Sequence, residues 1–310
     1  MPKFCTNCGK PLQSHWRVCP YCGKLFYPTP ISPSEQAEPQ LVVKVSTNNI
    51  DTQLDIKNGT LEKKRKWFTK KKIAIIIIVS SVVLAGILIP VITFYSSYQI
   101  RRISYYVNYG TTSKSYNCMI PRATYNYYNT QPHPSHASTD WDYVATTIAS
   151  YCTPNEQELL KIAQEVRSQC FNPSDEEELL NALLSFTQGI NYKSELFDRA
   201  SYPLETLIDQ GDCEDLSIFF GSLVECLGFE AVIICVLVFM DGEWLGHAVV
   251  GVHLDFTPTH HSSYPPSYYL NASEDANQYW ICETTAQGWM IGELPVDPSD
   301  FLIQSYAFVE

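Results

Sequence analysis

Positive charge is scarce in the C-terminal two thirds of this 310-residue sequence. Residues 103–310 contain 6 lysines and arginines against 28 aspartates and glutamates, a formal net charge of −22, whereas residues 1–102 carry +10. Nucleic-acid binding needs cations that replace the counterions of the phosphate backbone. We therefore expect no nucleic-acid partner for the acidic part, and the charge asymmetry predicts two halves that work in different settings.

The first 27 residues are too few to build a hydrophobic core. They contain instead two Cys-x-x-Cys pairs, each followed by Gly and Lys, in FCTNCGKPLQSHWRVCPYCGK (residues 4–24). Four thiolates at this spacing form a closed tetrahedral site that favours zinc, with two disulfides or an iron site as the alternatives. The segment resembles the short zinc ribbon of many prokaryotic N-termini, and we expect structural zinc to stabilise residues 1–27. The predicted ligands are Cys5, Cys8, Cys19 and Cys22.

A linker, a basic segment and a long uncharged run follow the N-terminal segment, in that order. Residues 28–62, which have few aromatic residues, are predicted to be a flexible linker, and residues 63–72 (KKRKWFTKKK) a basic juxtamembrane segment. Residues 73–95 are apolar over the length of a bilayer core and predict one transmembrane helix. The run starts too deep in the chain for a signal peptide and has no small-residue cleavage site.

The flanking charge predicts the orientation of this span. Seven cations precede it and only Arg101 and Arg102 follow closely, so the N-terminus is expected in the cytoplasm and the C-terminal domain outside the cell. The sequence thus predicts a single-pass cell-membrane protein whose partners are the lipid bilayer and a protein or peptide substrate. The ribbon, in a reducing compartment, is interpreted as a docking site for a cytoplasmic protein.

Beyond the span, residues 96–150 are rich in Tyr, Thr, Ser and Asn and are interpreted as a stalk or irregular lead-in. Residues 151–310 are predicted to be globular. Apolar spacing predicts helices over 155–170, over 174–190 with a Ser174–Glu177 capping box, and from 213 to Gly228; β-branched runs predict strands over 229–239, 244–254 and 278–284. Helices followed by strands predict an α+β fold with helices packed on a largely antiparallel sheet.

Three residues of this domain form a candidate catalytic set. Cys213, in GDCEDLSIFF (residues 211–220), begins a predicted helix, where the backbone N–H groups and the helix dipole favour thiolate. His247, in GHAVVGV, lies on a predicted strand and offers a base, and Glu283, in YWICETT, ends the next strand and offers a group that orients the base. Their order predicts a Cys-His-Glu triad.

These stretches, with FTQGINY (186–192), YPLETL (202–207) and CETTAQGWMIGELP (282–295), resemble the transglutaminase-like cysteine hydrolase superfamily, in its prokaryotic members that read GDCED, GHxxVGV and ETT. The resemblance covers about residues 155–295. It implies a papain-like core, Cys213 as nucleophile, His247 as base and Glu283 as orienting acid, in a membrane-anchored amide or peptide hydrolase or transamidase. Many relatives have Asp in the third place, so Glu283 requires slightly different spacing.

Other interpretations of the same residues remain. Asp212, Glu214 and Asp215 crowd the thiol and raise its pKa, which keeps open a catalytically inactive transglutaminase-like binding module. A metal held by Cys213 and His247 with neighbouring acids and His253 is weaker, because these residues form no tight cluster in the sequence.

Three smaller expectations concern neighbouring side chains. Asp212 is predicted to cap the helix, and Asp215 to point inward and accept hydrogen bonds from nearby backbone. Cys152 and Cys170 bracket a predicted helix and are interpreted as disulfide partners.

Overall fold

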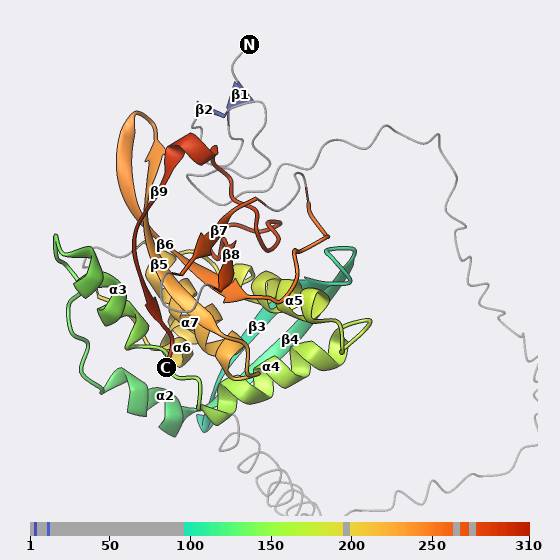
Figure 1. Cartoon of the computed structure of the whole chain (residues 1–310). Helices are drawn as coiled ribbons and strands as arrows, with labels where there is room; N and C mark the ends of the chain where they lie inside the picture. The colour runs from blue at the N-terminus through green and yellow to red at the C-terminus, as the bar shows by residue number, and fades with distance from the viewer. Residues whose placement is uncertain (1–2, 5–10, 13–95, 195–198, 263–266, 273–276) are drawn as a thin grey trace, which may run out of the picture. The chain divides into compact units, whose positions relative to one another are not determined.

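The computed structural model describes residues 3–4, 11–12, 96–194, 199–262, 267–272 and 277–310 (Figure 1). The predicted linker, basic segment and membrane span lie outside the described residues, as do the four ribbon cysteines. Within the described part, no helix has the length and hydrophobicity needed to cross a membrane. Near the N-terminus, β1 (Lys3–Phe4) and β2 (Pro11–Leu12) pair antiparallel, with Phe4 opposite Pro11.

The main sheet of the C-terminal domain has five strands in the order β7-β8-β6-β5-β9, and every neighbouring pair is antiparallel. The α+β fold with an antiparallel sheet is therefore confirmed. Its strands are β5 (Ala231–Met240), β6 (Glu243–His253), β7 (Tyr269–Asn271), β8 (Gln278–Cys282) and β9 (Phe301–Phe308), the last preceded by the 3-10 turn η1 (Pro298–Asp300).

The two central strands are joined by a tight turn at Asp241-Gly242. Met240 pairs with Glu243, so the connection has two residues, and both have positive φ, 56° at Asp241 and 90° at Gly242. Asp and Gly tolerate this conformation, and its twist matches that of the flanking strands. The tight turn fixes the register that brings His247 opposite Val236.

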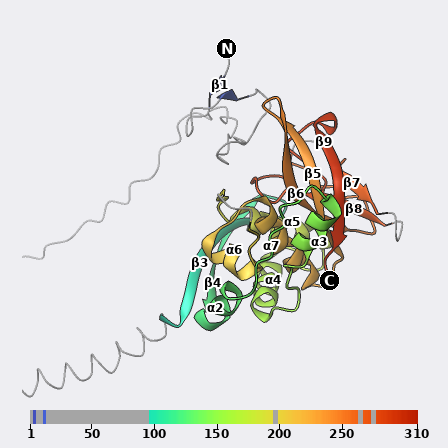
Figure 2. The ribbon, with the colours of Figure 1, turned by 90° about the vertical axis from the view of Figure 1, so that its left-hand side faces the viewer.

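The helices lie between this sheet and a long hairpin (Figure 2). α7 packs on β5 and β6, α3 packs on β5 and β9, and α5 contacts both α7 and β3. Their bounds are α2 (Arg122–Asn129), α3 (Trp141–Ala149), α4 (Gln157–Gln169), α5 (Glu176–Gln188), α6 (Pro203–Asp209) and α7 (Cys213–Glu225).

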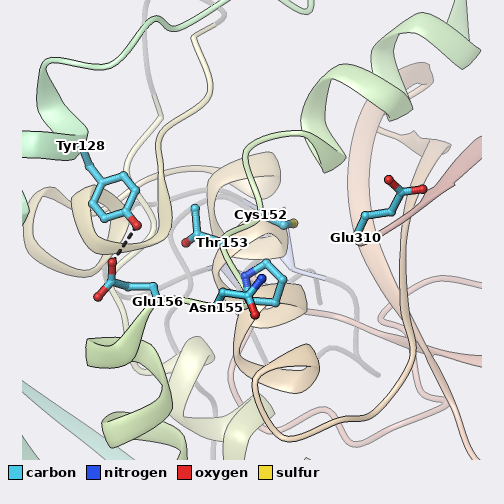
Figure 3. A pocket seen from close by; sticks show the side chains of 7 residues that line it. Tyr128, Cys152, Thr153, Asn155, Glu156 and Glu310 are labelled. Atoms are coloured by element: carbon cyan, nitrogen blue, oxygen red, sulfur yellow. Dashed lines mark hydrogen bonds between the residues drawn. The ribbon is translucent and has the colours of Figure 1, made fainter.

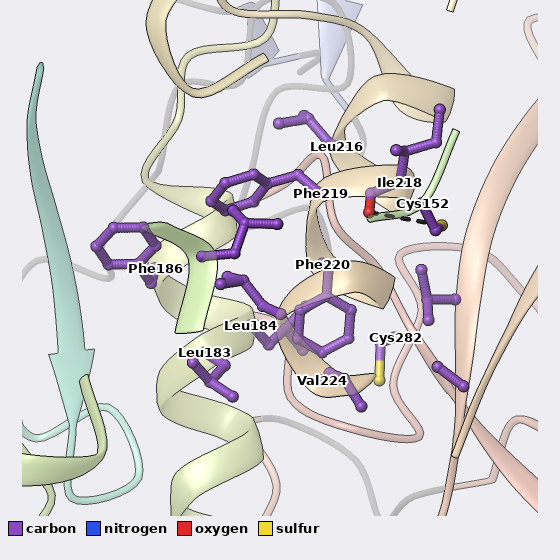
Figure 4. Close-up of a cluster of buried hydrophobic side chains, with 14 of the residues drawn as sticks. Cys152, Leu183, Leu184, Phe186, Leu216, Ile218, Phe219, Phe220, Val224 and Cys282 are labelled. Atoms are coloured by element: carbon purple, nitrogen blue, oxygen red, sulfur yellow. Dashed lines mark hydrogen bonds between the residues drawn. The ribbon is translucent and has the colours of Figure 1, made fainter. Parts of the chain in front are cut away.

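The core between helices and sheet is built largely from α5 and α7 (Figure 4). On α7, Leu216, Phe219, Phe220 and Leu223 are fully buried, as their shared helical face predicts. The helix ends before Gly228, whose φ is 84°, the left-handed conformation typical of a residue that follows a helix. Because these apolar side chains hold α7 against the sheet, they also fix the position of its first residue, Cys213.

The interpretation of residues 96–150 as a stalk is wrong. β3 (Tyr98–Val107) and β4 (Thr112–Pro121) form a ten-pair antiparallel hairpin, and α2 and α3 follow. Ile103, Tyr105 and Val107 alternate with exposed residues and are buried in the main core. The period-two pattern of one buried face, rather than the polar composition, decides the structure of this segment.

Two local expectations are also wrong. Asp175, not Ser174, caps α5: its side chain accepts from the Glu178 N–H at 3.2 Å. Cys152 and Cys170 are free thiols; Cys152 donates to the Ile218 carbonyl and Cys170 to its own helix at the Val166 carbonyl. Both thiols are buried against different helices, so each finds an acceptor locally instead of a partner sulfur.

Candidate active site

Cys213 is the first residue of α7, at the position that the sequence predicts. Asp212 is the N-cap and forms a capping box with Asp215, which reaches back to the Asp212 N–H at 3.3 Å. Asp215 is fully buried and also accepts from the Ser201 N–H at 2.6 Å. The inward orientation of Asp215 is thus confirmed, and this carboxylate ties the loop before α6 to the turn that presents the thiol.

The thiol of Cys213 faces strand β6. A backbone hydrogen bond from Ala248 reaches it and opposes the increase in its pKa. One turn further along α7, the Ser217 hydroxyl donates to the Ala248 carbonyl at 3.1 Å and lies 3.3 Å from the Thr284 hydroxyl. A single buried serine therefore joins the helix of Cys213, the strand of His247 and the segment of Glu283.

His247 pairs with Glu283, with 3.0 Å between Nε2 and Oε2. Burial lowers the pKa of His247, but the charge of Glu283 and its hydrogen bond, with smaller contributions from Glu214 and Asp212, raise it above its ordinary value. Burial raises the pKa of Glu283, but His247 and the hydrogen bonds from Thr285 outweigh it and the net pKa is lowered. Each partner favours the charged form of the other.

Glu283 is fixed by its surroundings. Only 3% of its side chain is exposed, and its second oxygen, Oε1, accepts from Thr285 through the backbone N–H at 2.7 Å and the hydroxyl at 2.6 Å. Its carbonyl accepts from the buried Gln188 amide at 2.7 Å. The extra methylene of Glu relative to Asp is accommodated, because the carboxylate reaches both His247 and Thr285.

One of the acids beside Cys213 is in direct contact with the thiol. Glu214 is buried, and its Oε2 accepts a hydrogen bond from the Cys213 thiol at 3.3 Å. Burial, followed by the charges of Glu214 and Asp212, raises the pKa of the Cys213 thiol well above its ordinary value. The arrangement favours a protonated thiol.

Two residues near the site were not singled out in the sequence. His136, buried in the segment between α2 and α3, lies with Nε2 3.5 Å from Oε1 of Glu214. Tyr192 forms a parallel bridge with Gly211; burial and then the charges of Cys213 and its neighbouring acids raise the pKa of its phenol. No local pattern marks His136, since it is 77 positions before Cys213 in an irregular segment.

The metal interpretation of this site receives no support. Among the described residues, no group of three or more His, Cys, Asp or Glu side chains is arranged to hold a metal ion. His253 is the last residue of β6, six positions after His247. Its Nδ1 lies 3.1 Å from the Gln278 carbonyl oxygen.

A separate pocket lies between α2 and the start of α4 (Figure 3). Tyr128 donates to Glu156 at 2.7 Å on its wall. None of the three candidate catalytic residues lines this pocket.

Comparison with known proteins identifies the N-terminal segment. The model of the zinc-ribbon domain matches residues 4–25, which include all four predicted ligands. A zinc ribbon therefore lies at the N-terminus of this chain. No curated protein matches the chain. A crystal structure from Cytophaga hutchinsonii, named "a Putative Cysteine Protease", is similar at 12% identity and a TM-score of 0.33, covering 68% of this chain and 73% of that one.

The donor set of the ribbon fits a structural metal ion. Cys5 and Cys8 lie in the sequence between Phe4 and Pro11, which pair in β1 and β2. Four cysteines in two Cys-x-x-Cys pairs match the all-thiolate ligand set of structural zinc. Zinc there would stabilise the ribbon and leave no open position for catalysis.

Proposed function

We propose that residues 96–310 form a transglutaminase-like cysteine hydrolase domain with the triad Cys213, His247 and Glu283. The observation that carries the proposal is the arrangement around β6. His247 pairs with Glu283 at 3.0 Å, and the adjacent residue, Ala248, contacts the Cys213 thiol through its backbone. Cys213, His247 and Glu283 come from three separate elements, and the contacts of Cys213 and Glu283 fall on two consecutive residues in the middle of this strand.

The reaction follows from these contacts. Glu283 occupies Nε2 of His247, so Nδ1 is the nitrogen that takes the thiol proton. The sulfur attacks an amide or peptide carbonyl carbon, and the Cys213 N–H, at the start of α7, is a donor for the resulting oxyanion. His247 returns the proton to the leaving amine as the C–N bond breaks. Water, activated by the same imidazole, then hydrolyses the thioester; an amine in its place gives transamidation.

The setting of the domain is part of the same proposal. The uncharged run of residues 73–95 and the basic residues before it support a single-pass anchor with a cytoplasmic N-terminus and an external hydrolase domain. The zinc ribbon would then bind a cytoplasmic protein, and the substrate would be a protein or peptide outside the cell.

The test is selective labelling of the full chain. A low dose of an electrophilic peptide probe, which enters the site as a substrate would, followed by peptide mapping, should label Cys213 before the other six described cysteines. Four of these donate to backbone carbonyls: Cys152, Cys170, Cys226 and Cys282. The C213A variant should lose this early label. Prior labelling of any other cysteine of residues 96–310 would contradict the proposal.

The second candidate is an inactive binding module of the same fold. It is favoured by one observation, the hydrogen bond of the Cys213 thiol to a buried carboxylate. The two candidates differ in the role of His247. In a binding module, His247→Gln leaves the reactivity of Cys213 unchanged, whereas in a hydrolase it slows the thiol.

A further inference from the structure

Two pairs of histidine and carboxylate lie close to Cys213, and the group nearer to the thiol differs between the pairs. In the first pair, the imidazole is that of His247, which is next to Ala248, the residue whose backbone contacts the thiol. Glu283 hydrogen-bonds to this imidazole. In the second pair, the Glu214 carboxylate contacts the thiol, and His136 contacts the carboxylate. The first arrangement supplies a base for the thiol; the second presents negative charge to it.

Glu214 is held in place on both of its oxygens. Oε2 accepts from the Cys213 thiol at 3.3 Å, and Oε1 lies 3.5 Å from Nε2 of His136. The side chains of Glu214 and His136 are 9% and 7% exposed, so water screens neither contact well. Glu214 therefore differs from an ordinary first-turn acid, which is solvated and interacts only with the helix dipole.

The chemistry of the pair decides what Glu214 does. A carboxylate has an ordinary pKa roughly four units below that of a thiol, so it is a poor acceptor of the thiol proton. It is a good hydrogen-bond acceptor for the neutral S–H, and its charge opposes thiolate formation. Glu214 in this position stabilises the thiol and works against His247.

We propose that Glu214, positioned by His136, keeps Cys213 protonated in the free protein and thereby restrains the nucleophile until a substrate displaces the carboxylate. This inference rests on the proposed function in taking Cys213 as the nucleophile and the domain as external. A neutral thiol is less readily alkylated or oxidised than a thiolate, which suits a cysteine exposed to an oxidising setting between encounters with substrate.

Several other titratable groups lie around the thiol. On its own helix these are Asp212 and Asp215, of which Asp215 is bound to backbone N–H groups. From neighbouring elements, Tyr192, His247 and Glu283 face the same region. Glu214 accepts a hydrogen bond from the thiol. Its other oxygen contacts His136, so a substitution can neutralise Glu214 without removing a contact of His247.

The test compares the pH dependence of Cys213 alkylation by iodoacetamide in the full chain, in the wild type and in Glu214→Gln. The amide keeps the shape and removes the charge, so the midpoint should fall by at least about one pH unit and the rate near neutral pH should rise about tenfold. Glu176→Gln, which removes an exposed acid from the first turn of α5, is the control and should leave the profile unchanged. An unchanged or higher midpoint in Glu214→Gln overturns the inference.

A second measurement does not depend on the folding of Glu214→Gln. The infrared difference spectrum between the wild type and C213A at neutral pH should contain an S–H stretching band shifted by a strong acceptor. A missing band means that Cys213 is already a thiolate and also overturns the inference. The failure of the proposed function is distinguishable, because it appears as identical thiol reactivity in the wild type and His247→Gln, whatever Glu214→Gln does.

Discussion

His247 Nε2 lies 3.0 Å from Glu283 Oε2, and the residue that follows this histidine provides the backbone contact to the Cys213 thiol. The strand β6 thus presents an imidazole to Glu283 and a backbone group to Cys213 at two consecutive positions. The consequences of this arrangement, and of the contacts that hold it, can be tested separately.

The ion pair predicts a pH-dependent contribution to stability. The lowered pKa of Glu283 stabilises the fold above its unfolded value of about 4.3, and this contribution is lost as the pH falls through the folded pKa. The raised pKa of His247 stabilises the fold below its unfolded value of about 6.5, and this contribution is lost as the pH rises through the folded pKa.

Both contributions are complete between about pH 4.3 and 6.5. Replacing Glu283 by Gln should therefore cost about 2 kcal/mol of unfolding free energy near pH 5.5 and less at pH 9, measured by denaturant unfolding at each pH. A cost that does not vary with pH would argue against a charged pair.

Asp215 should be essential for the turn that presents Cys213. Its carboxylate accepts from the backbone N–H groups of Ser201 and Asp212, and Asp215→Ala leaves these donors without their acceptor in a buried site. We expect a loss of about 3 kcal/mol and a clear fall in Tm in thermal unfolding followed by circular dichroism. The exposed acid Glu176 provides the control, since Glu176→Ala should change Tm little; an unchanged Tm for Asp215→Ala refutes the role.

Ser217 should affect reactivity more than stability. Its hydroxyl contacts the Ala248 carbonyl and the Thr284 hydroxyl, so it couples the three segments that carry the candidate triad. Ser217→Ala should cost about 1 kcal/mol in unfolding free energy but slow Cys213 acylation by about tenfold. Ser222→Ala, also buried on α7 but bonded to the Ile218 carbonyl and the Thr153 N–H, neither of which belongs to the segments of His247 and Glu283, is the matched control and should not slow acylation.

The zinc ribbon predicts a metal stoichiometry. Elemental analysis of the purified full chain should give one zinc ion per chain, and Cys5→Ser or Cys19→Ser should reduce it to near zero, because a structural site needs all four thiolates. Iron in place of zinc, or a full complement of zinc in both variants, would contradict the assignment of the ligands.

The sequence predicts α7 well because several local signals agree there. Asp212 caps the helix, Asp215 completes the capping box, an apolar face follows, and Gly228 comes just after the end. The β5–β6 hairpin was equally predictable, since Asp241-Gly242 selects the two-residue turn. Both elements depend on residues close to one another in the chain.

What the sequence does not reveal depends on distant contacts. The β3–β4 hairpin has a polar composition, and its alternating buried face, Ile103, Tyr105 and Val107, is meaningful only once α5 packs on it. The contact of His136 with Glu214 has no sequence signal, because both positions look like solvated residues until the segment between α2 and α3 covers α7.

The most direct test of a Cys213 nucleophile with a His247 base is acylation of the full chain by p-nitrophenyl acetate. We expect a burst of p-nitrophenolate with an acetyl group on Cys213, found by mass spectrometry, no burst in C213A, and at least about 100-fold slower acylation in His247→Gln. Equal rates of Cys213 acetylation in the wild type and His247→Gln would contradict the account.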